Sequence, residues 1–395
     1  MSTANIALVP LASVTTVPAN GYTGSSTEYW ALSAAQAREL QRVQDVEKAR
    51  IQLRRRQRIF TWMYNILAIG ELVYFIVGLY ITEWQVADLQ ENPLLGPGRE
   101  GVIKMGGTYT QRIVKRYQYW RLVSSLFYNA GAIHVTSNLG MVWAFGHLLV
   151  RELSPWLVAL MFFGGGMAGL MVSVNVGAQY STAGASIPAF ALAGAASAML
   201  VYRWRRYSCH WASVLTTGFM VGANAFMGAT PFVDNSGNTA GFVFGAVLCL
   251  GFMMVRRKET GTKAGEVLVY GTAVVAVAVI LAAIVAGLAG LQLGTPVAGC
   301  CNPWVCTSSS WWDCNAARIW PDTCTLTISS GAATNTTSTL TCPHGNTISV
   351  NIDSTADADA IQALCDSLCV NGASAVSSGG ASQSTGGDTS LKRRW

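Results

Sequence analysis

The chain has 395 residues, of which 51% are hydrophobic and only 12% are charged. A typical soluble domain carries about 25% charged residues, so this composition excludes an ordinary soluble protein. A mean hydropathy of +0.35 and 40 glycines are instead typical of a membrane protein. The net charge of +6 does not indicate nucleic-acid binding, because the basic residues gather beside apolar segments, where membrane topology explains them.

The N-terminal region, residues 1–59, is predicted to be cytosolic. The first arginine is Arg38, and no basic segment precedes the apolar stretch near the start. Both facts argue against a signal peptide and an Arg-rich mitochondrial transit peptide. Residues 1–28 are rich in Ala, Ser, Thr and Pro, which is typical of disorder. Residues 29–58 contain no Gly or Pro and favour a helix beside the membrane.

Runs of about 20 apolar residues predict transmembrane helices. Polar residues inside such runs are expected to face the bundle, because unpaired polar groups are costly in hydrocarbon. We expect a six-helix core over 60–258, followed by a cytosolic loop and a seventh helix over 259–293. The predicted spans are 60–82, 122–149, 155–175, 184–202, 208–228, 234–255 and 266–292.

Basic residues predict the orientation of these spans. Arginines at 50, 54, 55, 56 and 58 come before the first span, and Arg151 and the basic groups at 203–206 and 256–263 lie at alternate turns. The loops near 176–183 and 229–233 contain no Lys or Arg. The positive-inside rule then places the N-terminus in the cytosol and the C-terminus, seven spans later, outside the cell or in a lumen.

The region after the last span, 294–372, holds eight of the ten cysteines. An even, dense set of cysteines indicates disulfides formed in an oxidising compartment, and eight cysteines allow 105 pairings. Zinc binding is the alternative, but the region lacks paired Cys-x-x-Cys motifs and has only His344. The expected disulfide cysteines are Cys300, Cys301, Cys306, Cys314, Cys324, Cys342, Cys365 and Cys369.

Two further features of the C-terminal part bear on its location. Asn335 begins a glycosylation sequon on the side of the membrane predicted for the cysteines, and residues 373–395 are a Ser/Gly-rich stretch typical of a flexible tail. We therefore expect a protein of the secretory pathway or plasma membrane rather than of the mitochondrial inner membrane.

Polar residues interrupt the second and fourth predicted spans. The second contains Asn129, His134 and Asn138, whose spacings of five and four residues predict one broad helix face. The fourth opens with Gly184-Ala185-Ser186, where small neighbours leave the hydroxyl uncrowded. Each feature alone is more often an interhelical hydrogen bond than a functional site.

The sixth predicted span carries a glycine every fourth residue, a stripe that lets another helix approach closely. Alanines at the same spacing on the fourth span predict the surface that it meets. Such packing would bring Asn238 towards Ser186, although glycine stripes are mostly ordinary packing. The two stripes are Gly237, Gly241 and Gly245, and Ala189 and Ala193.

In combination these motifs resemble the rhomboid intramembrane serine protease family, across roughly residues 60–315. The cysteine-rich run 301–314 is similar to the luminal segment of plant and protist secretory rhomboids with a seventh helix. The resemblance implies a rhomboid fold of six helices plus one. The ordered motifs are Glu91-Asn92-Pro93-Leu94-Leu95-Gly96-Pro97, Trp120-Arg121-Leu122, His134 with Asn138, Gly184-Ala185-Ser186, and Val233-Asp234-Asn235 with Gly241-Phe242.

The resemblance also implies a role for each site residue. Ser186 stands at the position of the nucleophile, which attacks a peptide bond within the membrane, and Asn238 at that of the histidine base. His134 and Asn138 stand at positions that stabilise the oxyanion, a role for hydrogen-bond donors. Trp120-Arg121 belongs to the loop after the first span, which in the family forms a structural insertion in the outer leaflet.

The sequence departs from the family pattern at three places. An amide cannot take a hydroxyl proton near neutral pH, so Asn238 cannot replace the base. Asn129 stands where the family usually carries histidine. Ile187 follows Ser186 where the family usually has glycine and is expected to crowd the hydroxyl, and Pro188 removes a backbone donor.

We therefore predict a rhomboid-like pseudoprotease that binds transmembrane clients and acts in their trafficking, assembly or stability. One alternative is a structural subunit of a larger membrane assembly. Another is an active intramembrane serine endopeptidase, with His134 leaving its expected role to act as base, since Asp234 is expected to cap a helix. The expected partners are membrane lipids and client or subunit proteins, with no cofactor, metal or nucleic acid.

Overall fold

The computed structural model divides into two units, residues 1–56 and 57–395. The described part of the first unit is helical and mostly exposed, with ion pairs one turn apart such as Glu39–Arg42 at 3.6 Å. The second unit contains a helical bundle and a small sheet. The structure describes residues 26–177, 180–206, 209–256, 263–293, 306–317, 325–329, 337–341 and 347–350.

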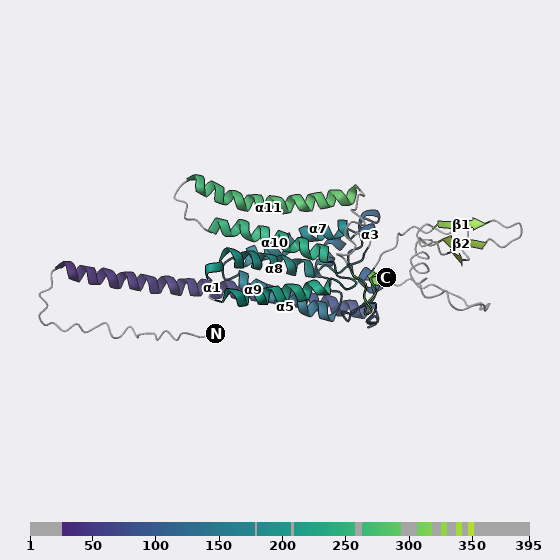
Figure 1. Ribbon diagram of the computed structural model, residues 1–395, viewed down its shortest axis with the longest axis horizontal. Coiled ribbons are helices and arrows are strands. Elements are labelled where there is room, and N and C mark those ends of the chain that lie inside the picture. The colour runs from purple at the N-terminus through teal and green to yellow at the C-terminus, as the bar shows by residue number, and fades with distance from the viewer. Residues whose placement is uncertain are drawn as a thin grey trace. The chain divides into compact units, whose positions relative to one another are not determined.

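Helices dominate the described residues (Figure 1). Short turns of 3-10 helix (η2, η4, η5) and one π turn (η3) join or interrupt them. The elements in chain order are α1 Ser26–Ile81, α2 Arg99–Lys104, α3 Thr110–Lys115, α4 Arg121–Ser124, η2 Ser125–Phe127, α5 Ala132–Leu149, α6 Pro155–Leu160, η3 Met161–Gly165, α7 Gly166–Val176, α8 Ser186–Tyr202, η4 Trp204–Arg206, α9 His210–Met227, α10 Asn235–Arg256, α11 Lys263–Gln292, η5 Cys314–Ala317, β1 Thr325–Ser329, β2 Thr337–Thr341 and β3 Thr347–Val350.

The predicted all-α polytopic membrane fold is confirmed. Within the described ranges, four helical segments are long and apolar enough to cross a membrane: Gln36–Ile81, Pro155–Val176, Asn235–Met254 and Tyr270–Gln292. They correspond to the first, third, sixth and seventh predicted spans. The other three predicted spans contain α5, α8 and α9, of which α8 is apolar but only 17 residues long.

The first span differs from its prediction because α1 is one continuous helix from Ser26 to Ile81. The sequence predicts a juxtamembrane helix over 29–58 and a span from residue 60 as separate elements, and the structure joins them. No Gly or Pro occurs between Ser26 and Ile69, so nothing in the local chemistry ends the helix at that point.

The second predicted span, 122–149, is wrong at its start, because α5 begins only at Ala132. The chain before it forms α4, η2 and a short extended segment. A long-range contact imposes the break: Asn92 Nδ2 donates to Ala130 O (2.8 Å), and a Cβ atom on Gly131 would overlap the Leu94 carbonyl. Residues 92–97 therefore occupy the space that a longer helix would need.

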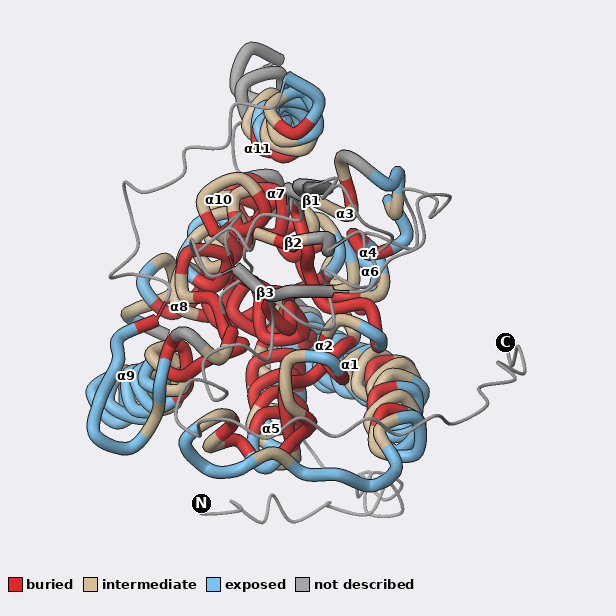
Figure 2. The backbone as a smooth tube through the Cα atoms, turned by 90° about the vertical axis from the view of Figure 1, so that its right-hand side faces the viewer, coloured by how far each residue is buried: buried red, intermediate tan, exposed pale blue. Residues whose placement is uncertain are grey.

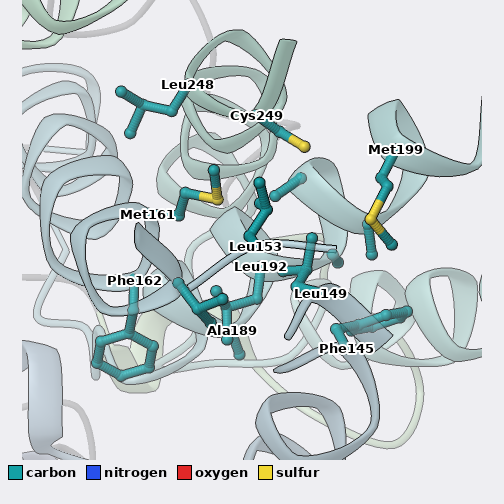
Figure 3. Packing of buried hydrophobic residues seen from close by; sticks show 14 of the residues in the cluster. Phe145, Leu149, Leu153, Met161, Phe162, Ala189, Leu192, Met199, Leu248 and Cys249 are labelled. Carbon is teal, nitrogen blue, oxygen red and sulfur yellow. The ribbon is translucent and has the colours of Figure 1, made fainter. Parts of the chain in front are cut away.

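Helix α8 lies at the centre of the bundle and contacts α5, α7, α9 and α10. Most of its side chains are buried, and Figure 2 shows buried positions gathered around α7, α8 and α10, while α9 and α11 present exposed faces. The main apolar core joins α5, η3, α8 and α10 (Figure 3). Its labelled members include Phe145, Leu149, Met161, Leu192, Met199 and Leu248.

A three-stranded antiparallel sheet, β1-β2-β3, was not predicted within the cysteine-rich region. Strands β1 and β3 alternate Thr or Ser with apolar residues, as is typical of a half-buried strand, whereas β2 carries a single apolar residue, Leu340. Leu340 of β2 pairs with Leu326 and Ile348 on its two sides and is fully buried.

Candidate functional site

The segment 182–185 leads directly into α8, whose first residue is Ser186. Parts of the chain far apart in sequence hold this segment through its backbone, so the position of the Ser186 hydroxyl is set by long-range contacts. Ala183 N donates to Phe232 O (2.7 Å), Gly184 N to Ser125 O (2.9 Å) and Ala185 N to Tyr128 O (3.2 Å).

Helices α8 and α10 approach each other closely at the predicted glycine stripe. A Cβ atom on Gly241 would lie 2.7 Å from Ile187 O, and one on Gly245 would overlap the Ala191 carbonyl. In the reverse direction, a Cβ atom on Gly194 would overlap the carbonyl of Phe242. The α8 residues that meet α10 at these points are thus 187, 191 and 194, so the predicted partner stripe of Ala189 and Ala193 is wrong.

Ser186 and Asn238 lie near the starts of α8 and α10 and are buried, with exposed fractions of 2% and 1%. Ser186 Oγ and both polar atoms of the Asn238 side chain have no hydrogen-bond partner among the described residues. Both Gly237 and Gly241, which flank Asn238 on α10, pack against Ile187. These contacts draw together the helix starts that carry the two side chains.

Ile187, which the sequence predicts to crowd the hydroxyl, packs against two neighbouring helices. Its side chain is 1% exposed and fills the space above three glycines, Gly169 on α7 and Gly237 and Gly241 on α10. Pro188 occupies the third position of α8, where a backbone N–H would have no partner within the helix. The proline therefore removes no helical hydrogen bond.

His134 is buried on α5, with an exposed fraction of 1%. Its Nδ1 accepts a hydrogen bond from Ala130 N (3.0 Å), so in the neutral ring the proton lies on Nε2. That Nε2 is buried without a partner in the described part of the chain. The Nε2–H group can therefore donate a hydrogen bond to a bound molecule, whereas the lone pair of Nδ1 already accepts from Ala130 N.

Asn129 and Asn138 form a pair, although Asn129 lies in the extended segment before α5 and not on the predicted helix face. Asn138 Nδ2 donates to Asn129 Oδ1 (2.8 Å), which leaves Asn138 Oδ1 buried without a partner among the described residues. Asn129 follows Tyr128, whose carbonyl accepts from Ala185 N, so the pair lies beside the start of α8. We call Ser186, Asn238, His134 and Asn138 the polar site.

Glu71 is the functional candidate that the sequence reading missed. It is 2% exposed on α1, and its Oε2 accepts a hydrogen bond from Asn129 Nδ2 at 2.8 Å. Glu71, Asn129 and Asn138 thus form a hydrogen-bonded chain from α1 to the polar site. The available signal was a lone carboxylate inside an apolar span, which by itself suggests a functional residue.

Trp120 and Arg121 hold the connection between α2 and α3. The Arg121 guanidinium donates to Ile103 O (2.8 Å), Gly107 O (3.0 Å) and Gln118 Oε1 (2.7 Å) and lies over the Trp120 ring at 4.7 Å. Burial lowers the pKa of Arg121 to about 10, so the group stays charged at neutral pH. These contacts are structural, since none of them involves the polar site.

Asp234 caps α10, as predicted. Its Oδ1 accepts from Ser236 N (2.7 Å) and from Ser236 Oγ (2.6 Å), which satisfies a free donor in the first turn of the helix. In the cysteine-rich region, a disulfide joins Cys306 and Cys314. The other predicted disulfide cysteines and the sequon at Asn335 lie outside the described residues.

Comparison with known proteins gives one matching family, the rhomboid domain, over residues 116–257. Three relatives from Arabidopsis thaliana are similar. RHOMBOID-like protein 1 is 25% identical over 78% of this chain and 86% of its own length. The mitochondrial RHOMBOID-like protein 6 is 29% identical over 44% and 56% of the two lengths. Inactive RHOMBOID-like protein 8 is 24% identical over 46% and 57%.

Proposed function

The chain belongs to the rhomboid family, and from this premise we propose that it is a pseudoprotease, which binds transmembrane client proteins without cleaving them. One observation carries the proposal: Ser186 Oγ has no hydrogen-bonded base among the described residues, and the base position is occupied by Asn238. Loss of the base costs a serine hydrolase about a millionfold in rate. One relative of the chain is itself named inactive.

The other candidate bases each accept a hydrogen bond from a group other than Ser186. His134 uses its lone pair at Nδ1 to accept from Ala130 N, and Asp234 uses Oδ1 to cap α10. Glu71 accepts from Asn129. None of these hydrogen bonds involves Ser186, and this supports the proposed loss of proteolysis.

The polar site offers hydrogen bonds that a guest can satisfy. Ser186 Oγ, His134 Nε2, Asn138 Oδ1 and the Asn238 amide are buried without partners in the described ranges. An unsatisfied buried polar atom costs about 1–3 kcal/mol. The peptide groups of a client segment that is not fully helical present both donors and acceptors, so they would match this mixed set.

A client helix would reach the polar site between α5 and α9. In the described part of the chain, helix α9 makes its substantial contacts with α5 and α8. Ser137 Oγ of α5 donates a hydrogen bond to Asn224 Oδ1 of α9 at 2.6 Å. The outer face of α9 exposes Trp211, Leu215 and Phe219, which suits lipid or an apolar helix.

The chain is an integral membrane protein surrounded by lipid, and we propose that its N-terminus is cytosolic and its C-terminus luminal or extracellular. The disulfide between Cys306 and Cys314 supports an oxidising compartment for the C-terminal part. It thereby supports our assignment of the protein to the secretory pathway or plasma membrane, whereas one relative is named mitochondrial.

The proposal is tested by labelling Ser186 in the purified protein with a serine-directed fluorophosphonate. We expect the wild type to label no faster than Ser186→Ala, because the hydroxyl lacks a base. Asn238→His puts a histidine at the base position. Its labelling rate shows whether the residue at position 238 alone limits the reactivity of Ser186. Ser186-dependent labelling of the wild type would establish an active hydrolase and overturn the proposal, and a stoichiometric partner in mild detergent would point to a structural subunit.

A further inference from the structure

The disulfide loop, residues 306–317, has a defined shape of its own. The bond between Cys306 and Cys314 closes a short ring, because the two cysteines are separated by 8 in sequence. Inside the ring, Ser309 Oγ accepts from Trp311 N (3.1 Å) and Trp312 N (3.3 Å), and Ser308 Oγ accepts from Cys314 N (3.3 Å). The loop can therefore act as one body.

This body is docked on three connections of the bundle: α1–α2, α7–α8 and α9–α10. Each connection contributes one backbone hydrogen bond. Asp313 N donates to Gln90 O (3.0 Å), Ser181 N donates to Ala317 O (2.9 Å), and Thr307 N donates to Ala229 O (3.2 Å).

Trp312 fastens the loop through its side chain. The indole Nε1 donates to Ala229 O (3.1 Å) and Thr307 O (2.9 Å), and its ring meets Phe226 edge to face at 6.2 Å. The neighbouring Trp311 is 76% exposed and lies outside the apolar clusters of the described residues. Trp312 thus contacts the bundle through its side chain, whereas the side chain of Trp311 is exposed to solvent. Because both residues are tryptophans, Trp311 is a suitable control for Trp312.

The docked loop packs against the chain segments that precede the polar site. Ala317 is 1% exposed and belongs to an apolar cluster with Tyr128, Ala183 and Val233. Ala183 lies three residues before Ser186, and Val233 lies five residues before Asn238. Two of the three connections held by the loop thus lead into the helices that carry the polar site.

We propose that the disulfide loop is a lid, which closes the polar site to water-soluble molecules from this end of the bundle and opens by undocking from Ala229. The role of the lid rests on the proposed function, because the lid would regulate when the unpaired groups of the polar site can bind a client segment. The family domain ends at residue 257, so the lid is contributed by a part of the chain outside that domain.

The experiment measures solvent access to position 186 without any client, so its outcome is independent of client binding. Ser186→Cys is made in the full chain with Cys209→Ser, which removes an exposed free thiol. A charged, membrane-impermeant maleimide is added in lipid nanodiscs, and modification at residue 186 is followed by peptide mass spectrometry. Ser197→Cys, about three turns further along α8, reports general loosening of the bundle.

We expect Trp312→Ala to raise the labelling rate at position 186 by about tenfold or more. Without the indole, opening of the loop no longer has to break its hydrogen bond to Ala229 or its packing, so opening costs less free energy. Trp311→Ala is the matched control and should leave the rate unchanged, as should either variant at position 197. The double variant Cys306→Ser/Cys314→Ser, which opens the ring, should also raise the rate at 186. Equal rates in all variants, or an equal rise at 186 and 197, would overturn the lid.

Discussion

At the scale of single residues, Glu71 is the group whose removal should disturb the polar site from a distance. Glu71→Leu leaves the Asn129 amide buried without its acceptor, which costs about 1–3 kcal/mol. We expect a lower thermal unfolding midpoint in detergent for Glu71→Leu and a smaller loss for Glu71→Gln, which keeps a carbonyl oxygen. Glu100→Gln, at an exposed carboxylate, is the control. A midpoint for Glu71→Leu equal to that of the control would show that the hydrogen bond contributes nothing.

Sequence reading located the residues of the polar site but not the bonds among them. Ser186, His134, Asn138 and Asn238 stand out because polar groups are rare in apolar spans, and all four are buried. The contact of Glu71 joins residues 58 positions apart, so no local pattern contains it. The orientation of Ile187 also depends on glycines of two other helices, which the sequence of α8 does not report.

At the scale of elements, the contact between α8 and α10 should tolerate no additional atoms. Gly245→Ala places a methyl group against the Ala191 carbonyl, and overpacking of this kind costs about 1–3 kcal/mol. We expect a clearly lower unfolding midpoint for Gly245→Ala. Gly218→Ala on α9 is the matched control, because a Cβ atom there meets nothing within 4 Å. Similar midpoints for the two variants would mean that the helices can separate at little cost.

The helices themselves follow from apolar runs and breaker residues, and their existence was predictable. Their ends were less so, because distant segments decide them. The start of α5 depends on Gly131 meeting Leu94, and α1 continues past residue 59 because no breaker occurs there. The sheet in the cysteine-rich region was missed, since its short strands of Thr and Ser resemble loop composition.

At the scale of the whole molecule, the orientation in the membrane can be tested at Asn335, the first residue of the only Asn-x-Ser/Thr triplet in the sequence. If the C-terminal part is luminal, the chain made in microsomes should carry a glycan that an endoglycosidase removes. Asn335→Gln should show no such shift. In sealed vesicles, external protease should cleave the N-terminal region while sparing the C-terminal part. Cleavage of the C-terminal part instead would reverse the proposed orientation.

The pairing of the cysteines and the docking of the disulfide loop could not be predicted. Eight cysteines allow 105 pairings, and the contacts that hold the loop join it to connections as distant as Gln90. Composition nevertheless predicted disulfides in this region, and the bond between Cys306 and Cys314 agrees with that expectation.

The chain of hydrogen bonds from Glu71 to Asn138 has a direction, and that direction has a consequence for the polar site. Asn129 donates from its amino group to Glu71 Oε2 and accepts at its oxygen from Asn138, so each of its two polar atoms has one partner in this chain of bonds. Asn138 then spends its amino group on Asn129 and presents its oxygen to the interior. A developing oxyanion requires donors at this place. Through Asn129, Glu71 on α1 thus leads Asn138 on α5 to present the partial negative charge of its oxygen, where an oxyanion would need the partial positive charge of an amino group.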